Sequence, residues 1–193
     1  MVGEEEPLSA RLASLCALLL ALAPALTCGE DYRAVGACRA GVPNGAYELR
    51  DANGSLRAVG AFALGHLTGT FVFWTPGGAR LAVLPFDNDV KNGTVALWYA
   101  AADAAVESGR KLEAPYVDDR PQGIQRSWHA DGRPRAEYRY EHGVLADAHA
   151  WTEAGEPLGD AAARGQAADD AEANARIYAS LLSLVREHRP PCG

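Results

Sequence analysis

The four tryptophans of this 193-residue chain occupy one position in a degenerate repeat, and this constrains the fold more than any other feature. The repeat has a period of about 24 residues, which is typical of stacked supersecondary units. Its units begin at Gly45, Gly69, Gly93, Gly123 and Ala146. A tryptophan stands five residues after each of the last four starts: Trp74, Trp98, Trp128 and Trp151. The chain is therefore predicted to fold as consecutive β-hairpins in one repeated register.

The turns and faces of these hairpins also follow the repeat. Glycine supplies the positive φ of a tight turn, and it stands nine residues after three of the unit starts: Gly54, Gly78 and Gly132. In the strand after each tip, apolar positions alternate with the residues of the other face. The apolar face is predicted to carry Ala58, Gly60, Phe62, Ala82, Leu84, Phe86, Ala136, Tyr138 and Tyr140. In the fourth unit the other face carries Arg135, Glu137 and Arg139, which indicates an antiparallel sheet with one face open to water. The third unit fits, with Tyr116 in the aromatic position, once an insertion near Ala100 to Ser108 is removed.

After Leu158 the alternation ends and an acidic, alanine-rich stretch begins. Residues 159–193 are predicted to hold a linker and then one amphipathic helix of about 16 to 20 residues. Asp169 and Glu172 form a candidate capping box, and Pro190 with Pro191 ends the helix. Its apolar stripe is Ile177, Tyr178, Leu181, Leu182, Leu184 and Val185. Because a lone helix of this kind is marginal in water, it is expected to cap the aromatic face or an open end of the sheet.

The N-terminal segment has the features of an export signal. The apolar run from Leu12 to Leu26 has the size of a signal-peptide core and is short for a transmembrane helix. The sequence Ala25-Leu26-Thr27-Cys28 resembles a lipobox, where a signal peptidase cuts before a cysteine that then carries lipid. Residues 1–27 are therefore predicted to be removed and Cys28 to be acylated. A cut after Ala25, which would release a secreted chain, is the alternative.

Cysteine parity favours the cut before Cys28. Cys16 would leave with the signal, and acylation of Cys28 would leave one pair, Cys38 and Cys192, in an oxidising compartment. This disulfide would tie the end of the chain to its beginning, and a bond between Cys28 and Cys38 is the alternative. Residues 28–40 are expected to form a tether between the lipid and the domain, and residues 41–158 to form the hairpin repeats.

Charge and motifs narrow the function classes. The formal net charge of −7, which stays negative without residues 1–27, argues against nucleic acid and against electrostatic attachment to anionic lipid. The chain has no Gly-x-Ser-x-Gly, His-Glu-x-x-His or phosphate-loop motif. The segment 87–93 departs from the ligand spacing of a calcium loop and is interpreted as a turn. A regular strand would send His129 and His149 to opposite faces, and His142 lies in a turn. No catalytic residue, metal or cofactor is expected.

The aligned tryptophans have two interpretations. Large rings in register can cover the sheet and form its core, because aromatic side chains contribute most of the burial in such structures. Rings aligned on one face can instead form a platform that stacks on a glycan or faces lipid. Trp128 is expected to tolerate replacement best, because Gln125, Arg126 and Ser127 make its strand the least apolar.

The units resemble MORN-type repeats, in the variant form of bacterial secreted proteins and lipoproteins. The two clearest units match at Gly69, Phe71, Trp74, Gly78 and Phe86, and at Gly123, Trp128, Gly132, Tyr140 and Gly143. The third unit departs from the pattern, since it lacks the tip glycine and carries the insertion. The resemblance implies an elongated, twisted antiparallel sheet of hairpins. It also implies a scaffold or binding role, and some bacterial relatives are labelled antitoxin components.

These features together predict an all-β repeat protein, capped by one C-terminal α-helix, that acts as a non-catalytic binding or scaffold module. We expect it to be exported and anchored by lipid, at the outer membrane or the periplasmic face. Its partner would be a protein or an envelope glycan. Two alternatives stay open at this stage: an antitoxin or immunity-like protein that neutralises a toxin, and an envelope enzyme that acts on glycan.

Overall fold

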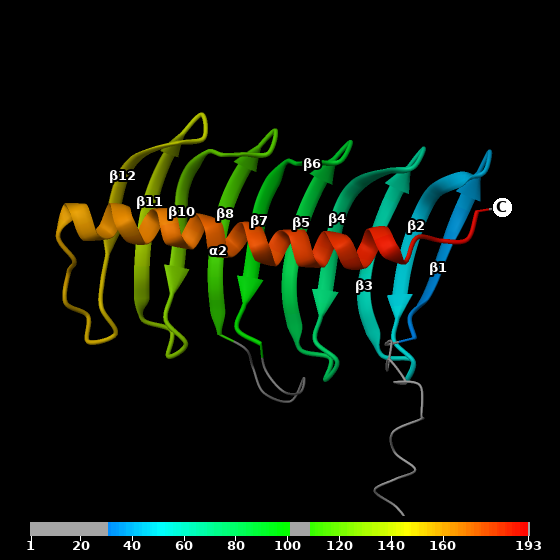
Figure 1. Cartoon of the computed structure of the whole chain (residues 1–193), viewed down its shortest axis with the longest axis horizontal. Coiled ribbons are helices and arrows are strands. Elements are labelled where there is room, and N and C mark those ends of the chain that lie inside the picture. Colours follow the sequence, from blue (N-terminus) through cyan, green and yellow to red (C-terminus); the bar gives the residue numbers. More distant parts are fainter. Residues whose placement is uncertain (1–30, 101–108, 193) are drawn as a thin grey trace, which may run out of the picture. The chain divides into compact units, whose positions relative to one another are not determined.

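A computed structural model of the protein describes residues 31–100 and 109–192. Its strands are β1 (Arg33–Arg39), β2 (Val42–Arg50), β3 (Leu56–Ala63), β4 (His66–Trp74), β5 (Arg80–Asp87), β6 (Val90–Lys91), β7 (Gly93–Trp98), β8 (Arg110–Val117), β9 (Arg120–Pro121), β10 (Gly123–Trp128), β11 (Pro134–Glu141) and β12 (Val144–Ala150), and the helix α2 (Asp160–Glu187) follows them. All twelve strands belong to one sheet, in which consecutive strands pair antiparallel (Figure 1). The short strands β6 and β9 pair with β5 and β8 beside the main row. The predicted sheet of consecutive antiparallel strands with one C-terminal helix is confirmed.

The hairpin tips repeat one set of backbone hydrogen bonds. The amide of Gly78 donates to the carbonyl of Thr75 at 2.9 Å, and the amide of Thr75 donates to the carbonyl of Ala79 at 2.8 Å. The same two bonds recur at three further glycines: Gly54, Gly132 and Gly155. All four glycines have φ between 81° and 88°, a conformation that other residues adopt only at a cost. The predicted tip glycines are confirmed, and Gly155 extends the series to the last unit.

The turns at the other end of the strands bond each unit to its neighbour. In the turn between β5 and β6, the amide of Asp89 donates to the carbonyl of Leu67 at 3.0 Å. The carboxylate of Asp89 accepts the amide proton of Leu67 at 2.7 Å and also contacts His66 Nδ1 at 2.5 Å. Equivalent backbone bonds to the preceding unit occur at Gly65, Asp119 and Gly143. These turn-to-turn bonds hold consecutive units in one register.

Helix α2 crosses the strands over one face of the sheet (Figure 1). Its 28 residues, at about 1.5 Å each, make about 42 Å, whereas nine spacings of about 4.8 Å between the ten strands of the main row make about 43 Å. The helix is therefore long enough to cover the row from β12 to β1. The predicted apolar face lies under it, and Phe62, Phe86 and Tyr140 are all buried there.

Phe71 lies at the centre of the larger of two apolar clusters. Its ring centroid lies 5.8 Å from the centroids of Phe62 and Phe86, both in the edge-to-face arrangement that aromatic pairs favour. Gly60 stands beside it in β3, and a Cβ atom there would lie 2.4 Å from the Phe71 ring. Glycine in this apolar position therefore makes room for the ring. The helix closes the cluster with Tyr178, Leu181 and Val185.

The helix is longer than predicted, because the alanine-rich stretch interpreted as a linker belongs to it. Ala163 and Ala167 are buried in the second apolar cluster, against alanines and tyrosines of β11 and β12. The predicted capping box is wrong, since Asp169 and Glu172 lie inside the helix and its N-cap is Gly159. Alanine has the highest helix propensity, and its small side chain lets the helix approach the strands closely. The helix therefore extends over this stretch because its alanines are buried, although the stretch carries no stripe of large apolar side chains.

The tether predicted for residues 28–40 is wrong in its second half. Residues 33–39 form strand β1, which pairs with β2 along its length, from the Arg33 and Arg50 pair to the Arg39 and Val42 pair. The strand lies at the edge of the sheet and most of its side chains are exposed, so no apolar alternation marks it. The proposed signal, residues 1–27, and the proposed lipid site, Cys28, lie outside the described residues.

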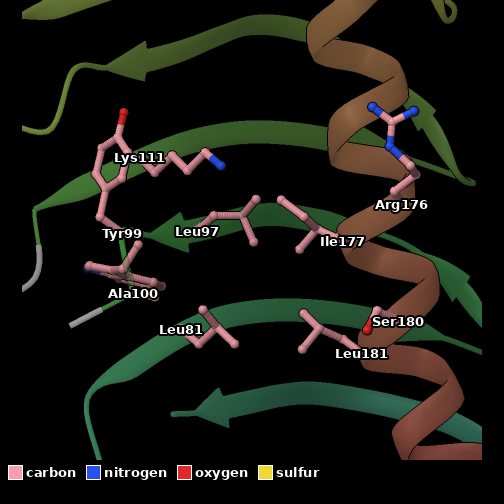
Figure 2. Close-up of a pocket in the computed structure, with 10 residues that line it drawn as sticks. Leu81, Leu97, Tyr99, Ala100, Lys111, Arg176, Ile177, Ser180 and Leu181 are labelled. Carbon is pink, nitrogen blue, oxygen red and sulfur yellow. The ribbon is translucent and has the colours of Figure 1, made fainter. Parts of the chain in front are cut away.

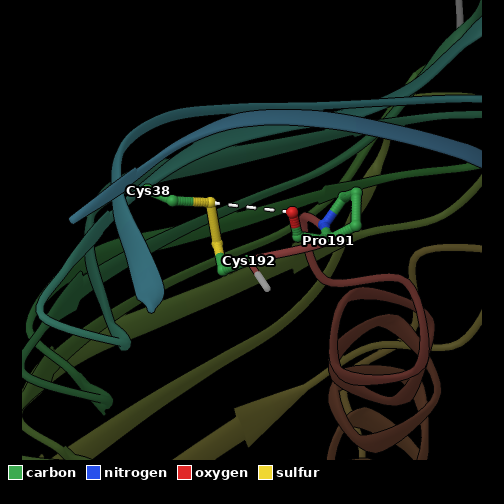
Figure 3. The surroundings of a disulfide bond; sticks show 3 residues. All are labelled: Cys38, Pro191 and Cys192. Carbon is green, nitrogen blue, oxygen red and sulfur yellow. Dashed lines mark hydrogen bonds between the residues drawn. A yellow bond between two sulfur atoms is a disulfide. The ribbon is translucent and has the colours of Figure 1, made fainter. Parts of the chain in front are cut away.

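The C-terminal end of the chain returns to the first strand. Cys38 of β1 and Cys192 are joined by a disulfide across 154 residues, as cysteine parity predicts (Figure 3). Cys38 Sγ also lies 4.0 Å from the carbonyl oxygen of Pro191. The far end of α2 is thus tied to the edge of the sheet. In the part of the chain that the structure describes, no helix is long and apolar enough to cross a membrane.

The tryptophans do not form the core of the sheet, which is one of the two interpretations of their register. Trp74, Trp98, Trp128 and Trp151 are all half-buried, and none belongs to either apolar cluster. Each tryptophan directly follows a buried strand residue, as Trp74 follows Phe73, so strand alternation turns its ring away from the buried row. The register shifts beside the first three place an extra residue in the partner strands: Leu81 in β5, Lys111 in β8 and Arg135 in β11. The buried rows are formed instead by the residues two and four places after each unit start, such as Phe71 and Phe73.

Candidate functional site

The buried face under α2 changes character at strand β10. The residues two and four places after the unit starts are Tyr47 and Leu49, Phe71 and Phe73, Val95 and Leu97, Gln125 and Ser127, and Ala148 and Ala150. Only the fourth unit places polar side chains there, and Gln125 and Ser127 are 6% and 7% exposed. Asn174 of α2, which is 9% exposed, lines the same cavity from the helix side. We call these three residues the polar layer, and it separates the two apolar clusters.

The polar layer lines a small cavity of about 190 Å³ between α2 and strands β8 and β10. The hydroxyl of Ser127 is buried and has no hydrogen-bond partner among the residues that the structure describes. A buried hydroxyl without a partner costs about 1–3 kcal/mol, so native proteins keep few of them. The cavity offers the unused donor and acceptor of Ser127, together with two buried amides, to whatever enters it.

One wall of this cavity is a fixed ion pair. The Arg135 guanidinium donates to both carboxylate oxygens of Asp170, at 2.6 and 2.8 Å, and the Tyr138 hydroxyl donates to the same carboxylate at 2.9 Å. Burial, and then the charge of Asp170, raise the pKa of the Tyr138 hydroxyl, which therefore stays protonated. The prediction that Arg135 faces water with Glu137 is wrong, because the bulge before Trp128 turns Arg135 toward the helix. Asp170 is thus fully occupied and leaves no free negative charge in the cavity.

An apolar groove of about 460 Å³ adjoins the cavity on the side of the aromatic cluster (Figure 2). Leu81 of β5 and Leu97 of β7 form its sheet side, and Ile177 and Leu181 face them from α2 (Figure 2). Its size falls within the range of about 300–1,000 Å³ that is usual for small-molecule sites. The groove and the polar cavity share Tyr99 and Lys111 in their walls, so an apolar and a polar hollow lie side by side.

Lys111 stands where the two parts meet. Its ammonium group lies 5.8 Å from the centroid of the Tyr99 ring, and the Tyr99 hydroxyl is held by the Trp128 carbonyl at 2.7 Å. Lys111 forms no ion pair with any residue in the described ranges, whereas the other lysine of the chain, Lys91, pairs with Asp119. The site therefore presents one unpaired positive charge beside neutral polar groups.

Of the four tryptophans predicted as a possible binding face, two line the groove or the cavity. Trp98 lines the apolar groove and Trp128 lines the polar cavity, while Trp74 lines neither. Trp98 is held between the guanidinium groups of Arg80 and Arg110, at 5.2 and 4.9 Å from its ring centroid. Trp128 and Trp151 also border a separate hollow of about 420 Å³ beyond β10. The tryptophans therefore do not form one common platform.

The polar residues of the site were missed at the sequence level, although one signal marks them. Gln125 and Ser127 stand at the repeat positions that are apolar in every other unit. The low apolarity of this strand predicts that Trp128 tolerates replacement, and it does not by itself indicate a site. Lys111 and Asn174 carry no comparable signal, because only the fold brings them beside β10.

No protein-family model matches the chain, and a search of curated proteins gives no match either. The described residues that line the groove and the cavity include no histidine or cysteine, and the one carboxylate among them, Asp170, is held by Arg135 and Tyr138. The arrangement can hold and orient a molecule that has an apolar and a polar end.

Proposed function

We propose that the protein is a non-catalytic binding module of the bacterial cell envelope, built from MORN-like hairpin units, which holds a small molecule in the site between α2 and the sheet. The observation that carries this proposal is that the apolar groove and the polar cavity lie side by side and share Lys111 and Tyr99. A site with mostly apolar walls and a few fixed polar groups is the usual form of a ligand pocket.

The composition of the site supports binding over catalysis. General acid–base or nucleophilic chemistry needs a group of suitable pKa within reach of a partner that activates it. Ser127 has no base beside it in the described part of the chain, and Asp170 is neutralised by Arg135. A binding protein needs neither a base nor a free carboxylate in its site. The hydrogen-bonded turns that stack the units hold the walls of such a site in place.

Location in the envelope is the second part of the proposal. The apolar run before Cys28 has the size of a signal core, and the pairing of Cys38 with Cys192 suits an oxidising compartment. We expect the wild-type chain to partition with membranes and Cys28→Ser to block processing or release the protein. A soluble wild type with its N-terminus at Leu26 would contradict lipid attachment and leave the binding site untouched.

A fluorescence titration with the neutral apolar probe N-phenyl-1-naphthylamine tests the binding site. We expect saturable binding of one probe per chain, and we expect Ile177→Trp, which adds a large ring inside the groove, to abolish it. Ile124→Trp is the matched control, because Ile124 is 40% exposed and lies on the sheet face away from α2. Equal binding by both variants, with melting temperatures close to wild type, would overturn the assignment.

A further inference from the structure

We infer that the ligand of this site is an amphiphile with a carboxylate head and an aliphatic tail, the head at the polar layer and the tail along the apolar groove. This inference rests on the proposed binding function and adds the chemical class of the ligand. It follows from the sign of the charge, the hydrogen-bonding groups and the walls of the site.

The charge at the polar end selects an anion. Lys111, which has no ion-pair partner among the described residues, stands where the cavity meets the groove. The charges of Arg135 and Asp170 cancel within their bidentate pair. Arg176, at the rim of the groove, is already paired with Glu172 on the same helix. A cationic head would meet an uncompensated ammonium group, whereas an anionic head would neutralise it.

The neutral groups of the cavity suit a small planar anion. Gln125 and Asn174 supply amide donors, and Ser127 supplies a hydroxyl that has no partner among the described residues. A carboxylate has two oxygens that accept several hydrogen bonds, so it can use these donors together with the ammonium of Lys111. The cavity of about 190 Å³ has room for such a head. It would also satisfy the buried Ser127 hydroxyl.

The groove suits an aliphatic tail. Leu81, Leu97, Ile177 and Leu181 are branched aliphatic side chains on facing elements (Figure 2). Trp98 lines the same groove, but both neighbouring guanidinium groups already stack on its ring. A flat stacking surface for sugars is therefore not free here. An alkyl chain gains from burial against such walls roughly in proportion to its length.

Isothermal titration of the full mature protein with octanoate, 1-octanol and octyltrimethylammonium tests the inference. We expect octanoate to bind about tenfold tighter than 1-octanol, the scale of one charge-assisted hydrogen bond, and the ammonium compound to bind weakest. Lys111→Met keeps the aliphatic stem and should remove the preference for octanoate over 1-octanol. Arg139→Met is the matched control, because Arg139 lies on the opposite face of the sheet and should leave the preference unchanged.

Two further variants keep the test decisive if Lys111→Met loses stability. Ser127→Ala removes only the unpartnered hydroxyl, and Asn174→Leu places an apolar side chain in the cavity; both should weaken octanoate more than 1-octanol. Equal affinity for octanoate and 1-octanol, or a preference for the ammonium compound, would overturn the carboxylate assignment while leaving the groove as a binding site. Binding of none of the three, together with no binding of the naphthylamine probe, would contradict the proposed function itself.

Discussion

The two ends of the interface between α2 and the sheet are filled in different ways. Toward β2 to β8, the C-terminal half of the helix packs on large rings such as Phe71 and Tyr47. Toward β11 and β12, its N-terminal half packs Ala163 and Ala167 on three alanines of the sheet and on the rings of Tyr138 and Tyr140. We call these the aromatic half and the alanine half. The turns and register of the strands are the same in both.

The difference shows that the repeat determines how the strands pair and stack, but not which side chains pack under α2. Hydrogen-bonded turns at Asp89, Asp119 and Gly143 stack the units whatever side chains lie under the helix. The halves therefore need not share one continuous core. The polar layer of Gln125, Ser127 and Asn174 occupies the junction, and the binding site lies there.

The largest effect is expected in the aromatic half. Phe71→Ala would remove a fully buried ring and should lower the free energy of unfolding by about 3–5 kcal/mol. The matched position in the alanine half is Ala148, where Ala148→Gly should cost about 1 kcal/mol because little volume is lost. Trp74→Ala should cost less than Phe71→Ala, because Trp74 is half-buried. Urea denaturation measures all three. A smaller loss for Phe71→Ala than for Trp74→Ala would contradict the assignment of the core.

The disulfide supports the aromatic half from one end only. Cys192→Ser should lower the free energy of unfolding by about 2–4 kcal/mol, since the bond closes a loop of 154 residues. Hydrogen exchange should become faster in β1 and in the last turns of α2, and it should stay unchanged in β11 and β12. Uniformly faster exchange along the helix would show that the two halves do not respond separately.

The alanine half depends more on its ion pair. Asp170→Asn would leave the Arg135 guanidinium, which is only partly exposed, without its carboxylate, and should cost about 1–3 kcal/mol. Asp169→Asn is the matched control, because Asp169 is exposed on the same turn of the helix and should change stability little. Thermal melting at neutral pH compares them. Similar melting temperatures for the two variants would mean that the ion pair does not stabilise this half.

The smallest effect is the pH-dependent contribution to stability of Asp89, in the turn between β5 and β6 of the aromatic half. Burial acts to raise the pKa of the Asp89 carboxyl, but hydrogen bonds from His66 and the Leu67 amide outweigh it and lower this pKa. Its stabilising contribution is therefore present above the ordinary carboxyl pKa of about 3.9 and is lost as the pH falls through the lower, folded-state pKa. Asp89→Asn should melt below wild type at pH 7, and the gap should close in acid. A gap that persists at pH 2 would exclude this carboxylate as its source, and Asp87→Asn serves as the control.

The sequence predicted the features that depend on local chemistry. The tip glycines and the apolar face of the second strands follow from turn conformation and period-two alternation, and both are present in the structure. The sequence did not predict the bulges that insert Leu81, Lys111 and Arg135 into β5, β8 and β11, because a bulge has no fixed residue signature.

The site could be predicted least, because it depends on contacts between distant segments. Asn174 and Ser127 are far apart in the chain, and they meet only because α2 crosses the sheet. The start of that helix has the sequence of a linker, since it is rich in alanine and carries no stripe of large apolar side chains. A helix that starts after this stretch does not place Asp170 and Asn174 opposite β10, so the sequence does not predict their part in the site.

Hydrogen exchange with and without octanoate tests most directly the claim that the junction between the two halves is a binding site. On saturation we predict slower exchange in β8, in β10 and over residues 170–181 of α2. Exchange in β2 to β4 and in β12 should not change, because these strands do not line the site. Protection confined to the open face of the sheet or to the hollow between Trp128 and Trp151, or no protection at saturation, would contradict the claim.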